Sequence, residues 1–67
     1  MSGRNAATDP RKGDRWQKAA RGRVLVREVV GVHEETVTYR NQKNALASAT
    51  LRTFIEWARY AVLTKEG

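Results

Sequence analysis

The sequence predicts a mainly β domain, in which five short strands close into a small barrel and one short helix precedes the last strand. Three observations predict this fold class. β-Branched residues are dense over residues 23–32. Apolar and polar residues alternate over residues 36–40. Apolar residues recur at helical spacing over 54–61, and a second β-branched and aromatic run overlaps their end at 60–64. This pattern predicts a helix followed by a strand.

One domain is expected over residues 13–67, after a disordered basic tail over residues 1–12. The tail is small and polar, has no periodicity and carries Arg4, Arg11 and Lys12. Such a segment buries too little apolar area to offset its ordering entropy. With 67 residues and no cysteine, the chain must be stabilised by a compact apolar core without disulfides.

The sequence of the first half of the domain predicts a short strand, a loop and a long strand. The Gly13–Asp14 turn leads into a strand at 15–17, and residues 18–22 (KAARG) are interpreted as a loop. The apolar positions of the strand at 23–32 change parity between Val26 and Val29. A bulge or bend near residues 27–28 would restore the alternation, and Gly31 offers a second bend.

The next segments predict a hairpin partner and a turn. Residues 33–35 are polar and connect the long strand to the strand at 36–40. Residues 41–44 (NQKN) are typical of a turn. Residues 45–51 are consistent with a helix, because they are rich in alanine, and with a strand, because they alternate.

A helix is expected from residue 53. Thr53 and Glu56 have the spacing of a capping box, with Thr53 as N-cap. Phe54, Trp57, Ala58 and Ala61 then share one face. Residues 61–64 either continue the helix or form a last strand, and we expect the strand because the open edge of the first strand needs a partner.

This order of elements resembles that of SH3-like small barrels. Residues 13–16 (GDRW) and 21–24 (RGRV) look like the strand starts of such barrels, including KOW-type modules. Residues 37–39 (VTY) and 57–59 (WAR) are similar to short stretches in uncharacterised phage and prophage proteins. The resemblance implies an SH3-like fold and a phage or prophage origin, in a class that includes nucleic-acid-binding and peptide-binding modules.

No metal site or cofactor is expected, and an enzyme is only a distant third alternative. The chain has no cysteine, no Gly-rich phosphate loop and no Ser-His-Asp spacing. Its single imidazole–carboxylate cluster, residues 33–35 (HEE), is interpreted as a turn, because adjacent strand residues point to opposite faces and one histidine gives too few ligands for zinc. No apolar run approaches the length of a membrane span or a secretory signal, so we expect a cytoplasmic protein.

The charge of the chain favours a polyanionic partner. The formal net charge is +6, nine of the 13 basic residues are arginines, and no acidic residue lies between Arg15 and Arg27. Guanidinium groups bind phosphate through two parallel hydrogen bonds. The sequence therefore predicts a small basic protein that binds DNA or RNA, mainly through the phosphate backbone. The expected contact residues are Lys18, Arg21, Arg23, Arg27, Arg40 and Lys43, with Trp16 or Tyr60 available for stacking on bases.

Three alternatives stay open at this point. The basic residues could form only a solvated surface that keeps the chain soluble. The aromatic side chains could fill the core, which we expect for Phe54 and Trp57 and leave open for Trp16. The chain could also be a protein-interaction module that docks on a host protein, or on itself as a homo-oligomer, through the edge strands of its sheet.

Overall fold

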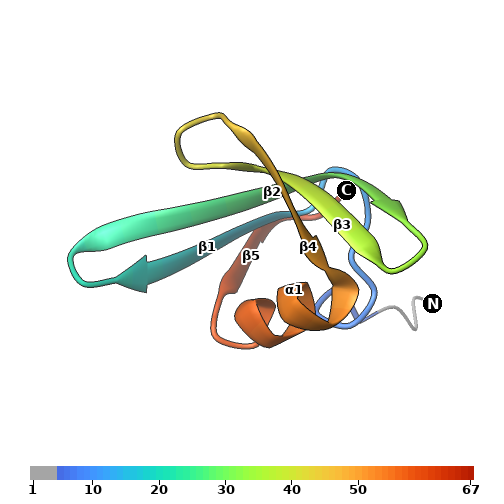
Figure 1. Cartoon of the computed structure of the whole chain (residues 1–67). Helices are drawn as coiled ribbons and strands as arrows, with labels where there is room; N and C mark the ends of the chain where they lie inside the picture. The colour runs from blue at the N-terminus through green and yellow to red at the C-terminus, as the bar shows by residue number, and fades with distance from the viewer. Residues whose placement is uncertain (1–4) are drawn as a thin grey trace.

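The computed structural model describes residues 5–67, which form five strands and one helix (Figure 1). The elements are β1 (Arg15–Ala20), β2 (Arg23–His33), β3 (Thr36–Asn41), β4 (Leu46–Thr50), α1 (Leu51–Ala58) and β5 (Val62–Lys65). All neighbouring strands are antiparallel, in the order β4-β3-β2-β1-β5. The mainly β class and the short helix before the last strand are therefore confirmed.

The sheet is open. β4 and β5 are its two outer strands, and within residues 5–67 they do not pair with each other. The chain passes from β4 to β5 through α1, which lies between them against one face of the sheet (Figure 1). Strand pairing therefore does not close the sheet into the barrel that the sequence predicts.

The first hairpin is longer than the sequence predicts. Residues 18–20 continue β1 instead of forming a loop, and pairing with β2 is regular as far as Ala20 and Arg23. Only Arg21 and Gly22 form the turn, with φ of 52° and 77°. Two successive positive φ values are what a two-residue type I′ hairpin turn requires, so the ladder runs to the turn without a loop.

The irregularity of β2 lies later than predicted. Pairing is regular through residues 27–28, so the bulge expected there is wrong. The register instead shifts between Val29 and Gly31, where the second bend was expected. Val26 and Val29 are both buried although they point to opposite faces, and Arg27 takes an inward-facing position between them.

The β3–β4 turn and the strand after it agree with the sequence pattern. The Oδ1 atom of Asn41 accepts hydrogen bonds from the backbone N–H groups of Lys43 (2.9 Å) and Ala45 (3.0 Å). Residues 46–50 then form a strand, which decides between the two structures left open. Tertiary pairing decides it, because β4 finds a complete partner in β3 and its small residues Ala47 and Ala49 pack against the core.

The helix begins earlier than predicted. Its N-cap is Thr50, whose side-chain oxygen accepts a hydrogen bond from the backbone N–H of Thr53 (3.1 Å). Thr50 is extended (φ −65°, ψ 155°) because it ends β4, and this is the conformation of an N-cap residue. The predicted capping box at Thr53 is therefore wrong. The predicted final strand is confirmed as β5, which pairs with β1.

The core lies between the sheet and α1. Phe54 and Ala58, four residues apart, are the buried residues of the helix. Phe54 and Val37 are 0% exposed and Val29 is 1% exposed. The cluster of buried residues is completed by Trp16, Tyr39 and Ala58.

The segment before β1 lies against this core. Ala6 and Ala7 pack on the core and Pro10 is buried. Asp14, itself 0% exposed, accepts hydrogen bonds from the backbone N–H groups of Arg11 (3.0 Å) and Gly67 (2.9 Å). The domain boundary and the disorder of the tail stay predictions, and Arg4 lies outside the described residues.

Candidate nucleic-acid interface

Part of the β1–β2 hairpin extends beyond the rest of the sheet. β5 pairs with β1 only as far as Gln17, and β3 pairs with β2 only from Arg27 onward. Residues 18–26 therefore pair only within the β1–β2 hairpin and project as a two-stranded arm, at the left of Figure 1. We call residues 18–26 the basic ribbon, because they contain Lys18, Arg21 and Arg23 and no acidic residue.

Two of these three cations share one face. Directly opposite residues of an antiparallel pair lie on the same face, and side chains alternate along each strand. The pairs Lys18–Leu25 and Ala20–Arg23 thus lie on the same face as the pair Trp16–Arg27. This face is the one that α1 covers, since the Lys18 Nζ atom lies 5.8 Å from the centroid of the Trp57 ring. Arg21 occupies the turn at the end of the ribbon.

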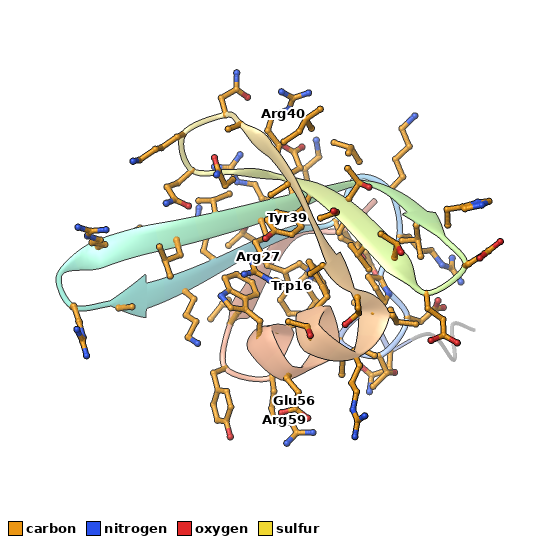
Figure 2. The ribbon with its side chains drawn as sticks, viewed as in Figure 1. Trp16, Arg27, Tyr39, Arg40, Glu56 and Arg59 are labelled. Carbon is orange, nitrogen blue, oxygen red and sulfur yellow. The ribbon has the colours of Figure 1, made fainter. Side chains whose placement is uncertain are left out.

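Three acidic side chains pair with arginines outside the ribbon. Asp9 pairs with Arg11 (3.3 Å), Glu28 with Arg15 (4.0 Å) and Glu56 with Arg59 (3.4 Å). Glu56 and Arg59 lie on the outer side of α1, away from the ribbon (Figure 2). Within residues 5–67, the ribbon's cations form no salt bridge to a carboxylate. The basic ribbon therefore carries a charge of +3, which is half of the formal net charge of +6, without an acidic residue.

One exposed aromatic ring accompanies these cations. Tyr60 is 70% exposed, as the sequence predicts, and its ring centroid lies 5.7 Å from the Lys18 Nζ atom. An exposed ring beside a cation is the pairing that binds an unstacked base and its phosphate.

Trp16 does not provide such a ring. It is 4% exposed and belongs to the core cluster. Its neighbours Arg15 and Gln17 are polar because they point to the opposite face of β1, so the polar flanks do not indicate exposure. Of the two roles left open for Trp16, the structure supports core packing, and the ring has no free face for a base.

Arg27 lies between two aromatic rings. Its guanidinium carbon is 4.5 Å from the centroid of Tyr39 and 4.4 Å from that of Trp57 (Figure 2 labels Arg27 and Tyr39). Burial lowers the pKa of Arg27 from its ordinary value, and the neighbouring Tyr39 hydroxyl opposes this shift. An arginine stays protonated at neutral pH despite such a shift. In residues 5–67 its buried Nη1 atom has no hydrogen-bond partner.

A shallow pocket of about 200 Å³ adjoins this guanidinium at the base of the ribbon. The residues that line it include Arg27, Tyr39, and Asn41 and Gln42, where β3 ends. Gln42 also connects the end of β3 to β2, because its Oε1 atom accepts a hydrogen bond from the Val26 backbone N–H (3.3 Å). A cation and two amides around one pocket can bind a phosphate oxygen or the edge of a base.

Arg40 and Lys43 lie outside the basic ribbon. Arg40 neighbours Tyr39 in β3, whose ring is in the core, so Arg40 points to the opposite face (Figure 2). There its Nη1 atom donates a hydrogen bond to the Asn44 carbonyl (3.3 Å). Lys43 is exposed in the β3–β4 turn. Arg40 therefore does not extend the face that carries Lys18 and Arg23, and the contribution of Lys43 stays a prediction.

Sequence reasoning missed the contribution of Trp57 and Gln42 to the site. Trp57 has the helical spacing of a core residue, and it does contact the core, yet its partly exposed ring also covers Arg27 and approaches Lys18. The signal that could have identified these partners was the inward-facing position that strand alternation gives Arg27. A charged residue at an inward position requires a partner there, and aromatic rings are common partners for arginine.

Two other results bear on the site. Within residues 5–67, no three His, Cys, Asp or Glu side chains are grouped as a metal ion would require, and the one helix is too short to cross a membrane. Comparison of the chain with protein-family models, with curated proteins and with solved structures finds no match.

Proposed function

We propose that this protein binds nucleic acid, through phosphate contacts made by Lys18, Arg21 and Arg23 of the basic ribbon. The observation that carries the proposal is the charge distribution. Arg21 and Arg23 are exposed, no carboxylate lies on the ribbon, and within residues 5–67 no salt bridge involves a cation of the ribbon. Phosphate contacts of this kind supply most of the affinity of non-specific binding.

Arg27 and Tyr60 would add two different contacts. The rings on either side of Arg27 hold its guanidinium in one orientation, beside a pocket large enough for a phosphate group. A group that is already oriented loses less conformational entropy on binding. Tyr60 would contact the sugar–phosphate backbone, while Lys18 beside it contacts the adjacent phosphate.

We further propose that the fold belongs to the SH3-like small-barrel class. The strand order, with the two outer strands connected by one short helix, supports this assignment. Phage or prophage origin and cytoplasmic location stay proposals from the sequence.

The experiment is a salt titration of binding to a fluorescein-labelled 20-base-pair DNA duplex, followed by anisotropy. Three phosphates neutralised by the basic ribbon predict that log K falls against log salt with a slope of about −2.7, and a fourth bound beside Arg27 would bring the slope to about −3.6. The double variant Arg21→Gln/Arg23→Gln removes two of these contacts, so the slope should fall in magnitude by about 1.8.

The matched control is the double variant Arg52→Gln/Arg59→Gln, which removes the same charge from α1. Arg52 and Arg59 are exposed and lie outside the ribbon. This control should leave the slope near that of the parent. Binding that does not respond to salt, or equal losses in the two double variants, would contradict the proposal.

A protein-interaction module is the second candidate function. The outer strands carry large exposed apolar residues, with Leu46 of β4 at 60% and Val62 of β5 at 66% exposure. Exposed strand edges of this kind pair with a further strand. We propose a second copy of the chain as that partner, forming a homo-oligomer. Sedimentation equilibrium should then show a dimer that Val62→Lys disrupts, and a monomer at all concentrations would exclude it.

A further inference from the structure

The width and length of the basic ribbon determine which nucleic-acid groove it can enter. Lys18–Ala20 and Arg23–Leu25 pair only with each other, so the ribbon is one hairpin wide and has no neighbouring strand on either edge. Strands lie about 4.8 Å apart, and each residue adds about 3.3 Å of length. Three paired residues on each strand therefore extend about 10 Å beyond the sheet before the turn is counted.

These dimensions match one groove of B-form DNA. Its major groove is about 12 Å wide and about 8.5 Å deep, and it admits a two-stranded β-ribbon, whereas the minor groove is only about 6 Å wide. The ribbon is also narrow at its end, where residues 19, 20 and 22 are Ala, Ala and Gly. The major groove of A-form RNA is too deep and narrow for side chains to read.

The positions of the cations agree with that placement. Arg21 is in the turn, the part of the ribbon that would reach deepest, and an arginine there can donate two hydrogen bonds to the O6 and N7 atoms of guanine. Lys18, at the base of the ribbon, lies nearer the rim of a groove, where the phosphates are. Arg21 is held at φ 52°, a conformation that favours Gly or Asn over Arg.

We propose that the basic ribbon enters the major groove of duplex B-form DNA, with Arg21 directed at the base edges and Lys18 and Arg23 at the phosphates. This inference rests on the proposed function and names the substrate class, double-stranded DNA. It also distinguishes the roles of the cations, because a base contact responds to sequence and a phosphate contact does not. With Arg21 at a base edge, one phosphate fewer is neutralised, so the salt slope for duplex DNA should be smaller in magnitude by about 0.9 than if all three cations contact phosphates.

The experiment compares four probes at one salt concentration: a 16-base-pair DNA duplex, the same duplex as RNA, one of its DNA strands, and the DNA duplex premethylated at guanine N7. The unmodified DNA duplex should bind at least about tenfold more tightly than the RNA duplex, the single strand and the premethylated duplex. A ligand that fills the DNA minor groove should not compete.

Two variants test shape and charge separately. Ala19→Phe widens the exposed ribbon without changing its charge, and phenylalanine is well tolerated in strands. It should weaken binding of the DNA duplex and leave binding of the single strand unchanged. Arg21→Asn retains the turn, because Asn adopts positive φ readily, and should abolish the loss caused by guanine N7 methylation.

The outcomes separate this inference from the proposed function. Salt-dependent binding that is equal for duplex and single strand, or that the minor-groove ligand displaces, would overturn the major-groove placement and leave nucleic-acid binding in place. The absence of binding to all four probes would overturn both.

Discussion

The guanidinium carbon of Arg27 lies 4.4 Å from the centroid of the Trp57 ring, and the Tyr39 ring covers it from another side at 4.5 Å. These contacts join the middle of β2 to α1 at the base of the basic ribbon. Arg27 therefore occupies an inward-facing position of β2 at which strand alternation would place an apolar residue. One side chain thus contributes to packing and also presents a positive charge beside the pocket.

Arg27 substitutions should separate packing from charge. Arg27→Met keeps the side-chain volume and removes a partly buried cation, so we expect an unfolding free energy within about 1 kcal/mol of the parent. Arg27→Ala leaves a gap between two rings and should cost about 2 kcal/mol or more. Urea unfolding followed by tryptophan fluorescence measures both changes.

Arg27→Lys is the control for the stacked guanidinium. Lysine keeps the charge, but its compact ammonium is more strongly hydrated and has no plane to lie against the rings. We expect Arg27→Lys to be less stable than Arg27→Met. The reverse order would show that charge, and not stacking, stabilises this contact.

The turn of the ribbon offers a substitution that stabilises the fold. Arg21 has φ 52°, which costs a side-chain-bearing residue roughly 1–2 kcal/mol unless it is Asn or Asp. Arg21→Asn should therefore raise the unfolding free energy by about 1 kcal/mol. Arg21→Val, a β-branched residue at the same φ, should lower it, and equal stabilities for the two variants would contradict the turn assignment.

The N-cap of α1 can be assigned by two alanine variants. Thr50→Ala removes the acceptor for the Thr53 backbone N–H and should cost about 1 kcal/mol. Thr53→Ala loses only the exposed contact between the two hydroxyl groups (2.9 Å) and should cost clearly less. Thermal unfolding of both variants is the measurement, and a larger loss at Thr53 would favour the cap predicted from the sequence.

The close packing of Gly67 predicts a steric effect. A Cβ atom there would collide with the carbonyl oxygen of Lys12 and lie 2.8 Å from the Gly13 Cα atom. Gly67→Ala should therefore break the Asp14–Gly67 hydrogen bond, at a cost of about 1–3 kcal/mol for the buried carboxylate left with one fewer donor.

Gly31→Ala is its control, because a Cβ atom at Gly31 meets nothing within 4 Å. Denaturant unfolding gives the two free energies, and amide exchange of β5 reports whether the end of the chain has moved away from Gly13. Equal stability of the two variants would contradict the packing described at Gly67.

The sequence by itself determined the elements that depend on local pattern. The β-branched run of β2, the alternation in β3 and the Asn-rich turn after it identify their structures without any partner, because the preferences act within a few residues. The concentration of cations between Arg15 and Arg27 is likewise a property of the sequence alone.

Only the tertiary structure decided the features that depend on distant neighbours. Residues 46–50 became a strand because β3 offered a complete partner, and the helix began at Leu51 because β4 ends at Thr50 in an N-cap conformation. Arg27 can point inward because its guanidinium packs against the rings of Tyr39 in β3 and Trp57 in α1. Arg40 lies on the opposite face of the sheet because the side chain of its neighbour Tyr39 is buried in the core. Pairing and burial between residues far apart in the chain set these outcomes, and a local pattern does not contain them.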